Sequence, residues 1–294
     1  MTIAGIMGLG TVGGALRDAF EAAGVATRTY DPYLGVGSID DLAPSDVVFV
    51  CVPTPADGDG GFDLSEVWAA VRDVAPALGA GAVIAMKSTV TPGTSDRLAA
   101  AFPNLRFCSV PEFLVAARPQ ESLTRPDRVI IGASSDEAAS LVASLMSAIS
   151  PSAPVVRMRP VEAELAKLCS NVMLASKVAL ANELAMICER FGVGWPAVQS
   201  AVGLDRRIGP DHLAVTAERG FGGGCFPKDL DGLIAAAREA GYTPTVLQEI
   251  ATFNRRIRAD AAGAATPDVR GNGSGSTVEA PGAESPIGAR GTDG

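Results

Sequence analysis

Gly8-Leu9-Gly10-Thr11-Val12-Gly13 is the stretch that decides the fold of the first half of the chain. It follows the apolar run Ile3–Met7 and opens the Ala-rich run Val12–Ala23, which predicts a strand, a tight turn and a helix in succession. Glycines in such a turn let a pyrophosphate approach the helix N-terminus, where free N–H groups and the helix dipole favour anions. The predicted dinucleotide-binding residues are therefore Gly8, Gly10, Thr11, Val12 and Gly13.

The next strand, Ala26–Tyr30, is followed directly by Asp31. A carboxylate at this place accepts hydrogen bonds from the adenosine ribose and repels a 2′-phosphate, which favours NAD over NADP. Arg28 lies close enough in sequence to leave NADP open. A glycine turn without a cofactor is the alternative, and the complete strand–turn–helix–strand unit argues against it.

Short apolar runs alternate with amphipathic stretches up to about residue 154. This alternation predicts a doubly wound, Rossmann-type α/β domain with a parallel sheet covered on both faces. Two loops follow strands of that sheet, Val52-Pro53-Thr54-Pro55 and Lys87-Ser88-Thr89-Val90. Because ligands collect at the carboxyl ends of parallel strands, Pro53, Thr54 and Thr89 are expected at the cofactor. The predicted strands are Ile3–Met7, Ala26–Tyr30, Val47–Val52, Ala82–Met86, Arg106–Val110 and Arg128–Gly132.

The second half of the chain has a different pattern. Val161–Phe191 predicts one long helix, and shorter helices are predicted at Trp195–Val202, Asp229–Ala240 and Thr245–Arg258. From Gly263 the chain is rich in glycine and poor in large apolar residues, which is typical of disorder. The predicted units are an NAD-binding domain at 1–155, an all-helical domain at 156–262 and a disordered tail at 263–294.

The long helix carries a polar group among its apolar positions. Glu164, Lys167 and Asn171 share one helical face, separate from a stripe formed by Leu165 and Leu168. A lysine beside a fixed amide accepts a proton or stabilises an oxyanion. Taken alone, the same spacing also fits an ordinary exposed lysine.

The most specific stretch is Gly220-Phe221-Gly222-Gly223-Gly224-Cys225-Phe226-Pro227-Lys228-Asp229. The glycines allow close approach of a ligand, and Pro227 marks a helix that begins near Phe226. A thiol at a helix N-terminus beside Lys228 is a candidate nucleophile. The other four cysteines lie in apolar runs and are expected to be structural: Cys51, Cys108, Cys169 and Cys188.

Composition narrows the class of protein. A net charge of -9 over 294 residues argues against nucleic acid as a partner. Scattered cysteines without a CxxC pair favour a reducing compartment, and a single histidine, His212, leaves no visible zinc site, so no metal is expected. The apolar runs are too short to span a membrane, and the N-terminus shows no basic segment of a signal peptide. We expect a cytoplasmic protein without a membrane partner.

With these motifs in place, residues 1 to about 258 resemble the UDP-glucose/GDP-mannose dehydrogenase family. Besides the stretches above, the resemblance rests on Pro111-Glu112-Phe113-Leu114, Pro126-Asp127-Arg128 and Asp205–Gly209, all in family order. It is closest to the UDP-glucose 6-dehydrogenase branch. The resemblance implies NAD as cofactor, a nucleotide-sugar substrate, a homodimer and two successive oxidations at the sugar C6.

The resemblance also implies residue roles. Cys225 forms a thiohemiacetal and then a thioester, and Lys167 and Asn171 stabilise the oxyanion. Asp229 and Glu112 handle protons or position water, with Thr89 near the nicotinamide. Arg207 matches an arginine that reaches the substrate of a neighbouring subunit. The remaining substrate-binding residues implied are Phe113, Leu114, Phe221, Gly222 and Phe226.

The sequence departs from the family in the loop after Leu114 and at the C-terminal end. A family glutamate is Ala116 here, and a later family aspartate is Ser122. Family members carry a third, C-terminal domain that binds the nucleotide diphosphate, and we expect this chain to lack it because low-complexity sequence begins near residue 260. UDP-glucose is the first candidate substrate and GDP-mannose the second.

Two other functions stay open from the sequence. A 3-hydroxyacid-type NAD dehydrogenase also joins a dinucleotide-binding domain to a helical domain that bears Lys-x-x-x-Asn. A truncated, non-catalytic NAD- or nucleotide-binding protein is the second. Cys225 and Glu112 argue against the first alternative, because a single hydride transfer needs no thiol.

Overall fold

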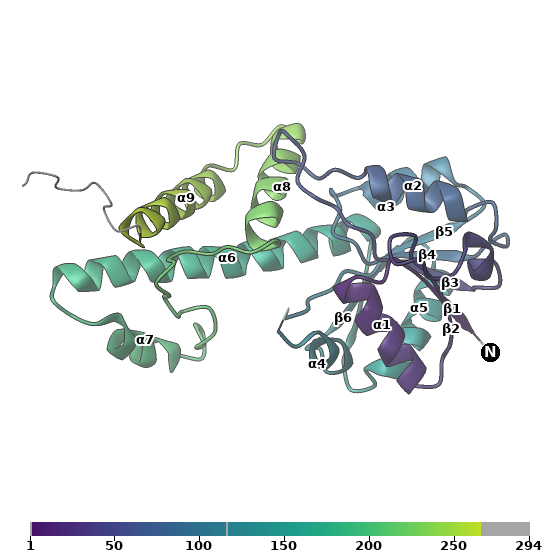
Figure 1. Ribbon diagram of the computed structural model, residues 1–294, viewed down its shortest axis with the longest axis horizontal. Coiled ribbons are helices and arrows are strands. Elements are labelled where there is room, and N and C mark those ends of the chain that lie inside the picture. The colour runs from purple at the N-terminus through teal and green to yellow at the C-terminus, as the bar shows by residue number, and fades with distance from the viewer. Residues whose placement is uncertain (1, 116, 266–294) are drawn as a thin grey trace, which may run out of the picture.

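The computed structural model describes residues 2–115 and 117–265, and these form two lobes connected by one long helix (Figure 1). The strands are β1 (Ile3–Met7), β2 (Ala26–Tyr30), β3 (Val47–Val50), β4 (Val83–Met86), β5 (Arg106–Ser109), β6 (Val129–Ala133) and β7 (Val155–Met158). The helices are α1 (Thr11–Ala22), the 3-10 helix η1 (Ile39–Leu42), α2 (Ser65–Val74), α3 (Thr94–Ala101), α4 (Pro119–Thr124), α5 (Asp136–Ile149), α6 (Pro160–Arg190), α7 (Trp195–Gly203), α8 (Phe226–Glu239) and α9 (Thr245–Ala265).

The first lobe is built on a single sheet with the strand order β2-β1-β3-β4-β5-β6-β7. Neighbouring strands from β2 to β5 are parallel, which confirms the predicted doubly wound fold. From β1 the chain passes to β2 on one side and then to β3 on the other. The topological switch point, where such folds bind ligands, therefore lies at the carboxyl ends of β1 and β3.

The far end of the sheet differs from the sequence prediction in two ways. β6 runs antiparallel to β5, because the segment between them forms a loop and the short α4 instead of a crossover helix. β7 pairs parallel with β6 and ends at Met158, so the domain boundary predicted at residue 155 falls inside a strand. The pattern Val155–Met158 is short and half exposed, and it gave no clear strand signal.

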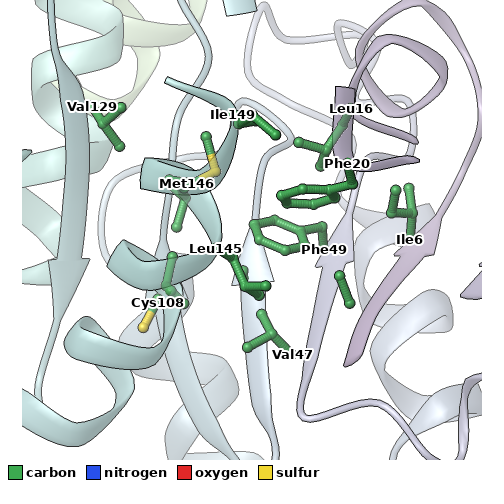
Figure 2. Packing of buried hydrophobic residues seen from close by; sticks show 14 of the residues in the cluster. Ile6, Leu16, Phe20, Val47, Phe49, Cys108, Val129, Leu145, Met146 and Ile149 are labelled. Atoms are coloured by element: carbon green, nitrogen blue, oxygen red, sulfur yellow. The ribbon is translucent and has the colours of Figure 1, made fainter. Parts of the chain in front are cut away.

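Helices cover both faces of the sheet, as Figure 1 shows for α1 and α5 on one side and α2 and α3 on the other. Figure 2 shows the core on the α1 and α5 side of the sheet. There the rings of Phe20 and Phe49 are in contact, with 5.4 Å between their centroids. The opposite core takes the alternate strand residues, such as Val48 and Ile84. Strands apolar on both faces are what a covered parallel sheet requires.

The second lobe is helical, as predicted, and α6 is its axis. α8 and α9 pack on α6 through an apolar cluster that includes Val172, Leu230 and Ile234. Farther along α6, Trp195 of α7 packs against Ala185 and donates its indole N–H to the Leu213 carbonyl at 2.9 Å. Together these helices hold the glycine-rich segment before α8 against α6.

Two details of this lobe correct the sequence prediction. Leu165, predicted in the apolar stripe of α6, is exposed, whereas Leu168 is buried on the same face as the polar residues Lys167 and Asn171. α9 continues to Ala265, past the predicted start of the tail at 263, because its alanines favour helix. The rest of the predicted tail, 266–294, lies outside the described residues.

Among the described residues, α6 is the one helix long and apolar enough to cross a membrane by length and composition. In its most apolar window, 44% of the residues are buried inside the protein. It also carries buried Glu164, Lys167 and Asn171. These are features of a core helix.

Candidate active site

The turn between β1 and α1 has the geometry of an anion-binding site. Gly8 adopts a φ of 87°, and a Cβ on Gly13 would lie 1.8 Å from the Gly8 carbonyl oxygen, so both positions require glycine. Gly10 has open space around it and caps α1 without a side-chain hydrogen bond. The N–H groups of Thr11, Val12 and Gly13 lie in the first turn, where an α-helix provides no intrahelical acceptor. The residues present therefore fit a dinucleotide pyrophosphate.

Asp31 lies where the sequence placed it, but its carboxylate is already engaged. Oδ2 accepts the Leu9 amide at 2.7 Å, while Oδ1 accepts the amides of Tyr33 and Leu34 at 2.9 and 3.0 Å. Asp31 is buried. Its first role is to join the end of β2 to the glycine turn. Ribose binding by its remaining lone pairs stays a prediction.

The loops after β3 and β4 meet at the same edge of the sheet. The amides of Lys87 and Ser88 donate to the Val50 carbonyl at 2.9 and 3.1 Å, and Ser88 Oγ donates to the Val52 carbonyl at 2.7 Å. Thr89 is half-buried in this edge. Thr54 is buried and Pro53 exposed in the neighbouring loop. The edge therefore brings the predicted cofactor residues of two loops together.

Glu112 and Lys167 form a buried ion pair between the sheet and α6. Their Oε1 and Nζ atoms are 2.8 Å apart, and Oε2 of Glu112 accepts the Leu114 amide at 2.6 Å. Burial by itself raises the pKa of Glu112, but Lys167, the Leu114 amide and Lys87 outweigh it and hold that pKa below the usual value. Lys167 is thus not the exposed helix lysine that its spacing alone would permit.

The ring of Phe113 contacts two cations, Arg128 and the Lys167 of this pair. The Arg128 guanidinium is 4.4 Å from its ring centroid and the Lys167 ammonium 5.4 Å. Arg128 also donates to Ser170 Oγ on α6 at 3.2 Å. The stacked ring fixes the orientation of both side chains.

One turn along α6, Asn171 contacts α8, the helix that follows Cys225. Its Nδ2 donates to Asp229 Oδ2 at 2.6 Å, and Lys228 Nζ lies 2.8 Å from the other oxygen, Oδ1. Asp229 is 1% exposed, so these two partners replace the water that its carboxylate would otherwise contact. Asn171 and Asp229 are therefore in direct contact, and Lys167 lies one turn earlier on the same helix. Their roles in a reaction stay predictions.

Cys225 immediately precedes α8 and is exposed. Its carbonyl accepts the Asp229 amide at 2.8 Å, which places the thiol residue one helical turn before that carboxylate. Phe226 packs near Phe221 and His212, at 6.3 and 5.9 Å between ring centroids. Cys225 is thus accessible, while Asp229 one turn later is buried.

Side chains from two helices hold the glycine-rich segment before Cys225. Asn254 of α9 accepts the Phe221 amide at 2.7 Å and donates to the Phe221 carbonyl at 2.9 Å. Asn182 of α6 accepts the Gly220 amide at 3.0 Å. The Arg258 guanidinium covers Gly222 so closely that a Cβ there would lie 2.9 Å from it. Sequence reasoning missed these asparagines, although a polar residue inside an apolar helical pattern is a detectable signal.

Two residues that the sequence singled out, Glu164 and Arg207, lie apart from the Glu112–Lys167 and Asn171–Asp229 pairs. Glu164 accepts the amides of Gly93 and Ser95 at 2.6 and 2.8 Å and caps α3, so it connects the lobes. Arg207 is exposed and pairs with Asp205 at 2.6 Å. Ser122, by contrast, lines a small pocket together with Glu112 and Phe113. Its hydroxyl donates to the Arg118 carbonyl at 2.8 Å and accepts the Val115 amide at 3.1 Å. Ala116 lies outside the described residues.

The other cysteines separate into two kinds. Burial raises the pKa of the Cys51 and Cys108 thiols to about 12, so both are inert structural residues as predicted. Cys188 is half-buried. The prediction was wrong for Cys169, which lies on the exposed face of α6. In the described part of the chain, no group of three or more metal-ligating side chains is found.

The fold and the loops define a two-lobed α/β protein with a dinucleotide turn and an accessible thiol. Comparison with known proteins gives the family. Residues 36–150 match the NAD binding domain of the UDP-glucose/GDP-mannose dehydrogenase family, and residues 161–256 match its central domain. The chain belongs to this family, and its first domain is the family's NAD-binding domain.

Individual relatives agree with the family match. The chain is 36% identical over 231 residues to a UDP-glucose 6-dehydrogenase of Haloferax volcanii, covering 73% of this chain and 53% of the relative. It is 35% identical to one from Pseudomonas aeruginosa, with 82% and 54% covered. The chain thus spans about half the length of the curated relatives it matches.

A solved UDP-glucose dehydrogenase from the hyperthermophilic archaeon Pyrobaculum islandicum is similar with a TM-score of 0.77 and 31% identity, covering 88% of this chain and 68% of that one. A 3-hydroxyisobutyrate dehydrogenase from Mycobacterium tuberculosis has a TM-score of 0.69 at 17% identity, over 89% and 95%. At that identity the second likeness concerns the fold alone.

Two glycines of the first turn provide a matched test of cofactor binding. Gly13→Ala should lower the free energy of unfolding by about 2 kcal/mol, because its methyl group overlaps the Gly8 carbonyl. Gly10→Ala has space for the methyl group and should change stability by less than about 0.5 kcal/mol, yet weaken NAD binding about tenfold by intruding on the pyrophosphate. Urea unfolding and NAD titration calorimetry measure both. Unchanged NAD affinity of Gly10→Ala would contradict this placement.

The Glu112–Lys167 pair should make stability depend on pH. Because the folded pKa of Glu112 is lowered, its contribution is complete above the unfolded value of about 4.3 and is lost as pH falls through the folded pKa. Glu112→Gln should cost about 3 kcal/mol at pH 7 and flatten this acid dependence. Urea unfolding between pH 7 and pH 3 tests it, with Glu121→Gln, from an exposed pair with Arg118, as control. An equally steep profile in Glu112→Gln would assign the dependence to other groups.

Proposed function

We propose that this chain is an NAD-dependent oxidoreductase that converts the C6 alcohol of a nucleotide sugar, UDP-glucose first among them, to the uronic acid. The observation that carries the proposal is an exposed Cys225 one turn before Asp229, whose carboxylate contacts Asn171 on α6. Relatives named UDP-glucose 6-dehydrogenase at 35–36% identity support this substrate class. GDP-mannose is the second candidate.

NAD, when bound, would accept a hydride from C6 in each of two oxidations, so one acid requires two NAD. The hydroxyl proton released in the first oxidation passes to water. The chain's own residues supply the rest of the chemistry. The sulfur of Cys225 adds to the C6 aldehyde, which forms a C–S bond and places negative charge on the former carbonyl oxygen. The Lys167 ammonium and the Asn171 amide are the donors that stabilise this oxyanion.

Oxidation of that adduct leaves a thioester on Cys225. A water molecule then adds to the thioester carbon, the C–S bond breaks, and the thiolate leaves as the acid forms. Glu112, held ionised by Lys167, takes the proton of the water, and Asp229 takes or returns the proton of the sulfur. Thr89 lies at the cofactor edge and is proposed to hold this water. An acid–base set without histidine is sufficient for these steps.

The substrate side is proposed from the residues around this group. Phe113 and Leu114 follow Glu112, and Phe221, Gly222 and Phe226 flank Cys225, so these residues line the sugar site. The Arg207 side chain is 89% exposed and is proposed to reach the substrate of a second subunit. The domain ranges 1–155 and 156–262 are proposed as functional units, with residues 156–158 completing the sheet.

The two alternatives are less well supported. A 3-hydroxyacid-type dehydrogenase shares the fold and the Lys-x-x-x-Asn pattern, but its single hydride transfer uses neither an exposed thiol nor the Glu112 pair. A non-catalytic NAD-binding protein would have no need for buried, paired Asp229 and Glu112. Burying such charges costs stability, and that cost favours a chemical role.

The thiol provides the direct test of the mechanism. With UDP-glucose the protein should produce two NADH for each acid. Cys225→Ala should lower acid formation by more than about a thousandfold because no thioester forms, and NAD affinity should stay within twofold. Spectrophotometry and calorimetry measure these quantities. Cys169→Ala, which removes the exposed cysteine of α6, is the matched control.

Two results would contradict the mechanism. One NADH per substrate with a carbonyl product favours the hydroxyacid alternative. Undiminished turnover of Cys225→Ala removes the covalent mechanism.

We also propose that the chain forms a homodimer through α6. Exposed apolar side chains repeat along one side of this helix. A cavity of about 480 Å³ between α6 and α9, which Cys225 and Asp229 do not line, extends this apolar surface through Leu180 and Phe253. Surfaces of this kind are typical of subunit contacts. The exposed residues are Met173, Leu180, Leu184 and Ile187.

Leu180→Glu should convert the dimer to a monomer, because a charge would be buried in the contact. Sedimentation velocity measures the mass. Leu34→Glu, an equally exposed leucine on the first lobe, should leave the dimer intact. A monomeric wild-type protein would remove this proposal without affecting the chemistry.

A further inference from the structure

The loop between β3 and α2 is a compact hairpin that reaches the second lobe. Ala56 and Phe62 form an antiparallel bridge at its base. Inside the turn, Asp57 Oδ1 accepts the amides of Asp59 and Gly61 at 2.9 and 2.7 Å. These bonds fix the backbone of the hairpin and with it the direction in which Phe62 projects.

Phe62 fits against a glycine in the second turn of α8. A Cβ on Gly232 would lie 2.2 Å from Cε2 of the Phe62 ring and 2.3 Å from Cζ. Both residues are buried. The ring therefore occupies the volume of the missing side chain, and this contact sets the position of α8 relative to the first lobe.

The face of the Phe62 ring contacts Lys228, the lysine that pairs with Asp229. The Lys228 ammonium lies 4.4 Å from the Phe62 centroid and 2.8 Å from Asp229 Oδ1. An aromatic face is electrostatically negative, so the ammonium is attracted on both sides. Lys228 thus has one preferred position, against the Asp229 carboxylate.

We propose that Phe62 is a positioning residue for the reaction, whose ring holds Lys228 on Asp229 and thereby orients the carboxylate one turn after Cys225. The same loop begins with Pro53 and Thr54 at the carboxyl edge of the sheet, where NAD is expected. One loop therefore contacts both the expected cofactor site and the helix that follows Cys225. This inference rests on the proposed function for its effect on turnover. The Phe62–Lys228 contact itself does not.

A double-mutant cycle tests the coupling. Phe62→Leu keeps an apolar side chain in the Gly232 notch but removes the aromatic face, and Lys228→Met keeps the side-chain volume but removes the charge. Phe62→Leu should lower kcat about tenfold through misplacement of Asp229, with KM for NAD within twofold. In the Lys228→Met background, Phe62→Leu should lower kcat by less than twofold, because the ammonium group that the ring positions is absent. Phe102→Leu, at the opposite edge of the sheet, is the matched control.

Two outcomes would overturn the proposal. An unchanged kcat in Phe62→Leu denies Phe62 any positioning role. An equal tenfold loss in the Lys228→Met background shows that the ring acts through packing alone.

The cycle is also measured on the unfolding equilibrium in urea, which needs no substrate. The contact should appear there as a non-additive change of about threefold in the equilibrium constant. Additive unfolding effects would overturn the contact itself. If the wild-type protein oxidises no nucleotide sugar but the unfolding effects are coupled, the proposed function fails while the contact stands.

Discussion

The arrangement of the site depends on two buried polar contacts made by neighbouring turns of α6. Lys167 meets Glu112 from the first lobe, and Asn171 meets Asp229 from the helix that follows Cys225. Charged groups removed from water are stable only with partners in good geometry. A shift of α6 by one residue would break both contacts together. The helix therefore fixes the carboxyl edge of the sheet and the segment that bears Cys225 relative to one another.

The sequence predicted much of this arrangement because the relevant signals are local. The glycine turn at 8–13, the strands β1 to β5 and the helix start near Phe226 each follow from contiguous residues. The face shared by Lys167 and Asn171 follows from helical spacing. The accessible thiol and the inert Cys51 and Cys108 follow from the flanking residues in the same way.

What the sequence could not give depends on partners distant in the chain. Glu164 shares a helical face with Lys167, yet it caps α3 some seventy residues earlier. Asp31 has the expected place, but the amide of Leu9 occupies one of its oxygens. Cys169 looked buried because its neighbours are apolar, and only the packing of α6 decides which side faces solvent. The reversed β6 and the short β7 likewise depend on pairing, which local patterns do not encode.

Glycine positions show how the two lobes are brought close enough to share a site. A Cβ on Gly132 of β6 would lie 2.6 Å from Ala163 of α6, and one on Gly232 of α8 would overlap Phe62. In both cases the missing side chain is the contact surface. Such contacts resist sliding, because any displacement meets backbone or a ring within a few tenths of an ångström. The buried polar pairs determine the register of α6, and the glycine contacts determine how closely α6 and α8 approach the first lobe. These contacts together fix the position of α8 and therefore of the exposed Cys225 that precedes it.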